Sequence, residues 1–312
     1  MRPMLPLIAA VLFISEFWLL NSAAQGLPTF EEFRAADRER RETGQRQTAE
    51  SVRLMRIDPR RVARVVADDP NDAQMLWGAA ELGGDWPLAL SVNRTNAAVA
   101  LRYACASAAK REYETALRWF RFCQNTDTNN LVPYLGELWI LRQQSNTNET
   151  FRPPETASVY QDYAIPAARA RIRVLEKAGY SPYSARRIGL MQNTYVEAMT
   201  QDLTREPTAQ TAPFLLTVSH SMQHRPTLLL TEFVGLRLER VLLNGKLQPE
   251  TDSEKRVEEI DDRRDDLQKL IATTERRTAD FATEAEMVQY FDDVLSYGEE
   301  IAMKRLQLAV GS

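Results

Sequence analysis

The chain has 312 residues, a formal net charge of −4 and two cysteines. This length allows one large domain or two ordinary ones. The mild acidity argues against a broad nucleic-acid-binding surface, and the cysteine count argues against a small module held together by disulfides.

The first 24 residues predict an export signal. The stretch begins with a positive charge, residues 4–20 are almost wholly apolar, and Ser22-Ala23-Ala24 supplies the small residues that precede a signal-peptidase cleavage site. We therefore expect a periplasmic or secreted protein. The alternative is an uncleaved membrane anchor formed by residues 4–23, although Glu16 disfavours a stable helix in lipid.

Residues 25–57 are rich in both charges and lack a continuous apolar stripe, so we expect a solvated helix or a charged, mobile tether. Asp58-Pro59 then has the form of a helix start. From there to residue 144 the apolar residues recur at helical spacing between short polar or glycine turns. This region is predicted to be a series of short helices.

The centre of that series is the stretch from Asn96 to Asn130, which reads as two antiparallel helices around a polar turn at residues 110–112. The stretch resembles a tetratricopeptide repeat and fits its 34-residue period. Small or aromatic residues occupy the packing positions of that repeat, and these are Ala104, Ala116, Phe120 and Cys123. Other family positions differ, because Ala100, Ser107, Arg111 and Thr128 replace the usual Trp, Tyr, Gly and Pro.

An upstream segment echoes the central repeat. Residues 86–90 (WPLAL) and 113–117 (YETAL) share the pattern aromatic-x-x-Ala-Leu. The resemblance implies antiparallel helix pairs, stacked as a short solenoid over residues 58–144, that bind a protein or peptide on a concave helical surface without a cofactor. Cys105 and Cys123 lie on the two helices of the central repeat and are expected to be either two thiols or one disulfide.

A polar stretch with two adjacent prolines, residues 145–157, is predicted to be a linker. The remainder, residues 158–312, is predicted to be a second, C-terminal helical domain. Residues 253–279 and 282–310 should form a long antiparallel hairpin within it. A homodimeric coiled coil, which would make the protein a structural oligomer, is the alternative use of these two segments.

The density of aromatic and arginine residues around residue 120 suggests a partner-binding surface. Trp119, Phe120 and Phe122 cannot share one helical face, so some of these rings should face outward. Aromatic and arginine side chains are enriched in protein interfaces. The predicted binding residues are Arg118, Trp119, Arg121, Phe122, Tyr134 and Arg142.

Catalytic and metal-binding patterns are weak. His220 and His224 share a helix face, but no third ligand lies in the same motif. We therefore predict no metal, no cofactor and no enzymatic activity. The alternative is an enzyme acting on an envelope polymer, which would use a buried carboxylate such as Glu197 or Glu232 opening into a cleft.

Overall fold

The computed structural model describes residues 26–44, 48–144, 151–190, 195–205, 207–224, 228–245 and 253–309. Regular structure within these stretches is helical, apart from an isolated bridge between Asn130 and Val159. The prediction of an all-α fold is therefore confirmed. The predicted export signal and the alternative anchor lie outside the described residues, and so does the first part of the predicted linker, residues 145–150.

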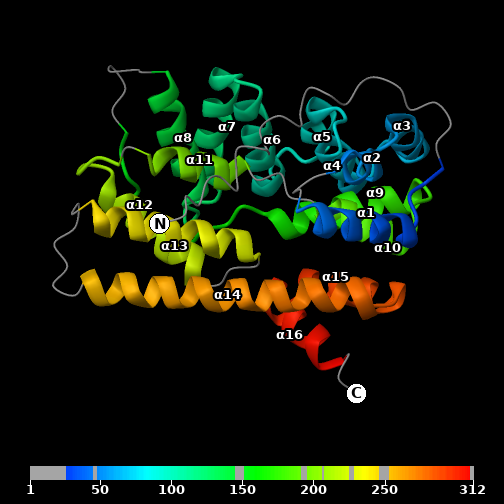
Figure 1. Ribbon diagram of the computed structural model, residues 1–312. Coiled ribbons are helices and arrows are strands. Elements are labelled where there is room, and N and C mark those ends of the chain that lie inside the picture. Colours follow the sequence, from blue (N-terminus) through cyan, green and yellow to red (C-terminus); the bar gives the residue numbers. More distant parts are fainter. Residues whose placement is uncertain are drawn as a thin grey trace.

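The helices form layers (Figure 1), and consecutive helices of the first layer pack on one another. The first layer comprises α3 (Pro59–Asp68), α4 (Ala73–Glu81), α5 (Trp86–Val92), α6 (Ala97–Ala109), α7 (Tyr113–Thr126) and α8 (Val132–Gln143). Two helices precede it, α1 (Phe30–Thr43) and α2 (Ala49–Leu54).

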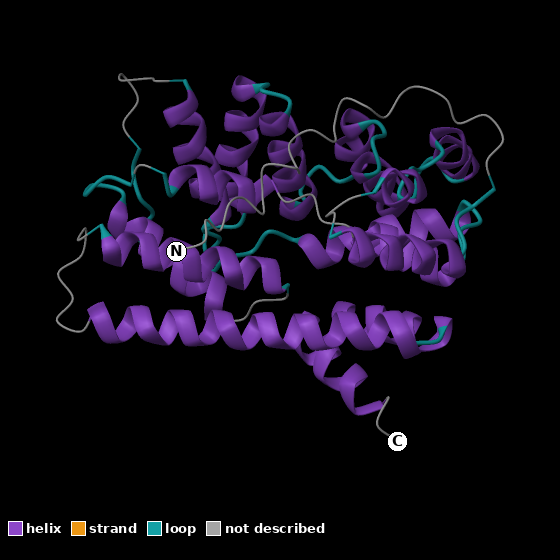
Figure 2. Ribbon diagram, viewed as in Figure 1, coloured by secondary structure: helices purple, strands orange, loops and turns teal. Residues whose placement is uncertain are grey.

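A second group of helices packs against the first layer, and a long helix lies along the far side of that group (Figures 1 and 2). The second group comprises α9 (Ala164–Lys177), α10 (Pro182–Leu190), α11 (Tyr195–Leu203), α12 (Ala212–His224) and α13 (Leu229–Asn244). The last helices are α14 (Ser253–Phe281), α15 (Glu284–Tyr297) and α16 (Glu299–Ala309).

Local sequence explains where the first-layer helices begin. A helix leaves its first backbone N–H groups without partners, and an Asp or Asn at the preceding position can accept from them. The helices α3 to α6 all begin in this way, at Asp58, Asp72, Asp85 and Asn96. The turn between α6 and α7 places Arg111, where the resembled family has glycine, at a φ of 63°. A non-glycine residue pays about 1 kcal/mol for this left-handed conformation.

Small residues allow the helices of the central repeat to approach one another closely. Ala104, Ala116, Phe120 and Cys123 are all buried in one core, which α8 closes from the other side. A Cβ atom added at Gly136 of α8 would lie 2.3 Å from the ring of Phe120, so only glycine fits there. These contacts place the four predicted packing residues between α6, α7 and α8, while the family resemblance itself stays a prediction.

The helices before and after the predicted linker share their cores. A Cβ atom at Gly78 of α4 would lie 2.2 Å from the carbonyl oxygen of Ala170 of α9, so these two helices are nearly in backbone contact. The core around Phe120 also includes Val196 of α11 and Leu238 of α13. Packing does not test whether either part folds alone, so the predicted domain boundaries stay a prediction.

The charged segment after the predicted signal is packed in part. Thr29 caps α1 through a reciprocal bond with Glu32, and Phe33 and Ala36 of this helix are buried. At the other end of the chain, the second arm of the predicted hairpin is two helices. Gly298, at a φ of 91°, separates α15, which packs on α10, from α16, which packs on α14.

Cys105 and Cys123 are buried free thiols. Burial raises the pKa of the Cys105 thiol to about 12, so it stays protonated near neutral pH. None of the helices in the described stretches combines the length and the apolarity needed to cross a membrane.

Candidate functional site

A row of four aromatic rings crosses α5, α6 and α7. Trp86, the first residue of α5, lies 5.7 Å from Tyr103 of α6 between ring centroids, and Tyr103 lies 5.8 Å from Trp119 of α7. Trp119 is in turn 5.4 Å from Phe122, which is three residues further along the same helix face. Trp86 is buried, whereas the other three rings are half-buried. We call these four residues the aromatic row.

The helix α7 supports the row from behind and carries arginines beside it. Ala116, Phe120 and Cys123 face the core, so they fix the helix that holds Trp119 and Phe122. Arg118 is exposed. The Nε of Arg121 donates to Glu137 of α8 at 2.9 Å, and about half of the Arg121 side chain remains in solvent. The structure thus brings Arg118, Trp119, Arg121 and Phe122 together on one helix.

The two remaining predicted binding residues lie on α8. Tyr134 is half-buried, and burial, followed by the nearby charge of Glu137, raises the pKa of its hydroxyl. Arg142 donates to the carbonyl of Leu203 at 3.2 Å and to the hydroxyl of Thr211 at 3.3 Å. Its guanidinium therefore ties α8 to the end of α11 and to the residue before α12.

A buried ion cluster joins α4, α6 and α9, and it was not found from the sequence. Glu81 of α4 accepts from the Nε and Nη2 of Arg102 of α6, both at 2.8 Å, and from Arg171 of α9 at 2.7 Å. Burial alone would raise the pKa of Glu81, but the two guanidiniums outweigh it and hold the pKa at about 2. The signal in the sequence was a lone arginine within the otherwise apolar run from Val99 to Ala109.

The two glutamates of the enzyme alternative are both buried. Glu197 accepts from the hydroxyl of Thr231 at 3.2 Å, and burial, followed by the charge of Asp162, raises its pKa to about 7. Glu232 accepts from Arg263 at 2.7 Å. Neither Glu197 nor Glu232 lines the hollow between α1 and α14 or the one beside α13. The alternative of an enzyme stays a prediction.

His220, one of the two histidines, lies beside a carboxylate that already has another partner. The Nε2 of His220 lies 3.3 Å from Glu239, a carboxylate that also accepts from Arg256 at 2.7 Å. Within the described stretches, no three His, Cys, Asp or Glu side chains are grouped so that they could hold a metal ion.

The comparisons with known proteins add no relative. No protein-family model matches the chain, and neither the curated proteins nor the solved structures contain a match. The aromatic row on α5, α6 and α7 therefore remains the best indication of function.

Proposed function

We propose that this chain is a non-catalytic, exported scaffold that binds a protein or peptide partner on the outer face of α5, α6 and α7. The observation that carries this proposal is the aromatic row, in which Tyr103, Trp119 and Phe122 are in ring contact and remain partly open to solvent. Aromatic and arginine side chains dominate the free energy of binding in protein interfaces.

The chemistry of the row suits a binding surface. Each ring offers a large apolar area and has few rotatable bonds, so little conformational entropy is lost on binding. The neighbouring rings and the buried Phe120 restrict Trp119 further. Arg118 and Arg121 at the edge can pair with carboxylates or with the carbonyl groups of a partner.

The packing of the chain also favours the outer face of α5, α6 and α7 as the binding surface, in place of the concave surface that tetratricopeptide repeats use. The chain's own α9 packs on α3 and α4, and its α11 packs on α6 and α8. A partner would have to displace those helices to reach the covered sides of α4 and α8. On the side that carries the aromatic row, Tyr103, Trp119 and Phe122 keep part of their surface exposed among the described residues, so no described helix has to be displaced.

Partner capture from an envelope extract of the source cells tests the proposal. The full chain is compared with the double variant Trp119→Ala/Phe122→Ala, because a truncation at Val159 would expose the core that α4 shares with α9. The helical circular dichroism should be unchanged, since both rings are half-buried, while a stoichiometric partner should be lost.

The control is Val52→Ala, which truncates an apolar side chain on α2 that is 38% exposed and lies outside the aromatic row. This variant should retain the partner. Equal capture by the wild-type chain and the double variant would contradict the proposal.

One observation favours a second candidate function, a structural oligomer formed through α16. Ile301 and Leu308 lie seven residues apart on one face of this helix and are 46% and 77% exposed. Tyr297, just before the helix, is 53% exposed. An apolar face of this kind on a terminal helix is suited to pairing with a second copy of the chain.

The mass of the protein in solution distinguishes the second candidate. An oligomer that dissociates when Ile301 and Leu308 are replaced by lysine would support it, because the charges would prevent burial of the face. A wild-type chain that is monomeric at micromolar concentration would exclude the structural oligomer and leave the partner-binding scaffold as the proposed function.

A further inference from the structure

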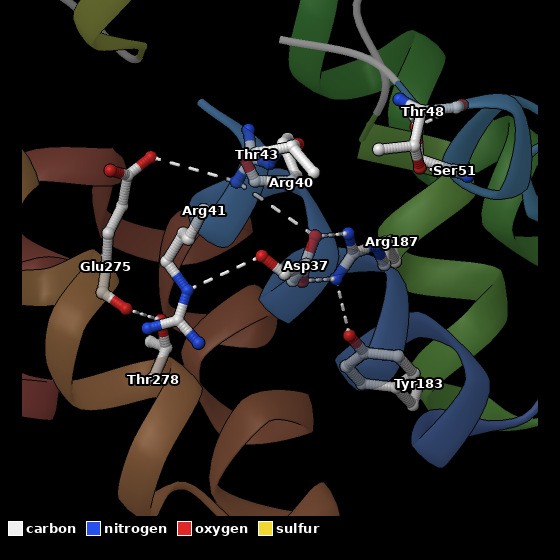
Figure 3. Close-up of polar contacts among 10 residues, drawn as sticks. All are labelled: Asp37, Arg40, Arg41, Thr43, Thr48, Ser51, Tyr183, Arg187, Glu275 and Thr278. Atoms are coloured by element: carbon white, nitrogen blue, oxygen red, sulfur yellow. Dashed lines mark hydrogen bonds and ion pairs between the residues drawn. The ribbon is translucent and has the colours of Figure 1, made fainter. Parts of the chain in front are cut away.

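A hollow lies where α1, α10, α14 and α15 meet (Figure 3), and it is separate from the aromatic row. It has an empty volume of about 440 Å³, part of which is open to solvent. The charged side chains that line it are Arg34, Arg40, Arg41, Arg187, Asp37 and Glu275. Two aromatic rings, Phe30 and Tyr183, form an apolar part of its wall with their centroids 4.9 Å apart.

The hollow is positively charged although the chain as a whole is not. Four guanidiniums face two carboxylates, an excess of two positive charges, whereas the whole chain carries a formal net charge of −4. A concave site with aromatic walls concentrates such a local field, because less water is present to screen it. The charge pattern therefore favours an anion of two negative charges.

One of the two carboxylates is already committed to a structural ion pair. Asp37 of α1 accepts two hydrogen bonds from Arg187 of α10, both at 2.8 Å, and the same guanidinium donates to the hydroxyl of Tyr183 at 2.7 Å. Figure 3 shows Asp37 between Arg187 on one side and Arg40 and Arg41 on the other. Arg187 and Asp37 thus form one rigid wall of the hollow.

Arg40 is held far more loosely than Arg187. Its Nη2 lies 4.0 Å from Asp37 and its nearest nitrogen is 3.9 Å from Glu275, whereas a charge-assisted hydrogen bond measures about 2.7 to 2.9 Å. The Arg40 side chain is 38% exposed, so its terminal nitrogens can turn towards an anion in the hollow without breaking a short hydrogen bond.

We infer that this hollow binds a phosphate dianion, either inorganic phosphate or the head of a phosphomonoester. Guanidinium groups recognise phosphate through paired N–H donors, which matches the donor-rich lining. The hollow is open to solvent on one side, so a phosphate could enter with its ester group directed outward. The inference goes beyond the proposed scaffold, because it concerns different helices and would hold whether or not the aromatic row binds a partner.

Calorimetric titration of the full chain with inorganic phosphate, at constant ionic strength set by chloride, tests the inference. Saturable binding is expected, with a Kd of roughly 0.1 to 1 mM. The melting temperature should rise by about 4 °C when phosphate exceeds the Kd a hundredfold. Arg40→Gln should weaken binding by roughly fivefold to tenfold, because one charge-assisted donor set is lost.

The matched control is Arg64→Gln on α3, which removes an exposed arginine outside the hollow and should leave the Kd unchanged. Arg41→Gln, at an exposed lining position, serves as a second test if Arg40→Gln does not fold. An equal rise in melting temperature with chloride alone would overturn the inference. An unchanged Kd in Arg40→Gln, or in Arg41→Gln where it is used instead, would overturn the inference as well.

The source of the phosphate is identified by two further titrations. Glycerol 3-phosphate represents a soluble monoester, and phosphatidylcholine vesicles with or without phosphatidic acid represent a lipid head group. Competition by glycerol 3-phosphate would support the inference with a soluble ligand. Binding to the phosphatidic acid vesicles that Arg40→Gln weakens would support it with a lipid ligand.

Discussion

Two sets of aromatic rings in this molecule have similar spacing but different surroundings. Around Tyr183 of α10, the rings of Phe30, Phe33 and Phe291 lie 4.9, 5.7 and 5.7 Å away, and Tyr183 itself is only 2% exposed. In the aromatic row of α5 to α7 the centroid distances are 5.4 to 5.8 Å, yet three of its four rings are half-buried.

The difference lies in what covers the rings. The cluster around Tyr183 is enclosed by α1, α10 and α15, so its burial stabilises the fold. The aromatic row is supported on one side only, so part of its apolar area contributes nothing to folding. Replacing rings in the first set should therefore lower stability, whereas replacing rings in the second set should mainly affect binding.

The largest expected effect is at the centre of the enclosed cluster. Tyr183→Ala should lower the free energy of unfolding by about 3 to 5 kcal/mol, because a large buried ring is lost and a cavity remains. Tyr297→Ala, at a tyrosine that is 53% exposed, is the matched control and should cost less than about 1 kcal/mol. Urea unfolding measures both, and similar losses would contradict the comparison.

The next effect concerns the ion cluster that holds α6, and with it Tyr103, against α4 and α9. Glu81→Gln should cost about 3 to 5 kcal/mol, because it leaves Arg102 and Arg171 buried without a countercharge. Glu155→Gln, at an exposed glutamate, should be nearly neutral. If both changes gave the same melting temperature, the cluster would have no structural role.

Glu197 on α11 should make stability depend on pH. Its pKa is raised from 4.5 to about 7 in the fold, so the native state binds a proton that the unfolded chain releases between these values. The free energy of unfolding should therefore fall as the pH rises from 4.5 to 7, by at most about 3 kcal/mol. Beside burial, the charge of Asp162 raises the pKa of Glu197 and the charge of Arg102 lowers it.

The variant Glu197→Gln isolates this contribution, because it keeps an acceptor for Thr231 but does not titrate. It should be more stable than the wild-type chain at pH 8 and close to it at pH 4.5. Denaturant unfolding at the two pH values measures the difference. A stability difference between variant and wild type that is the same at both values would contradict the raised pKa.

The smallest effect is expected at the edge of the aromatic row. Glu137→Gln removes the negative charge beside Arg121, whose side chain is 46% exposed, and should cost no more than about 0.5 kcal/mol. The rings of the aromatic row are unchanged in this variant, so capture of the partner should be unchanged. A loss of more than about 2 kcal/mol would show that this edge is structural.

The sequence predicted those features that depend on local chemistry. The start at Asp58-Pro59 was predicted because an N-cap and a proline act within one turn of helix. Ala104, Ala116, Phe120 and Cys123 were predicted to pack between helices because they occupy the packing positions of the resembled repeat, and all four are buried. The division of the last helices at Gly298 was missed, because a single glycine also occurs inside continuous helices.

The features that were missed arise from contacts between distant segments. Glu81, Arg102 and Arg171 meet because α4 and α9 approach at Gly78, and no pattern along the chain reveals that pairing. The packing of α1 was missed because only Phe33 and Ala36 of its charged sequence are buried. Arg142 was predicted as a binding residue together with Trp119 and Phe122, and the sequence did not show that its guanidinium donates to the carbonyl of Leu203 and the hydroxyl of Thr211.

The most direct test of the scaffold proposal is photo-crosslinking from the aromatic row in the source cells. A benzophenone amino acid replaces Arg118, an exposed residue next to Trp119, and in a control chain it replaces the exposed Glu155. The proposal predicts one discrete crosslinked protein from position 118, lost when Trp119→Ala is added, and none from position 155. No crosslink at position 118, or the same products from both positions, would contradict a partner on this face.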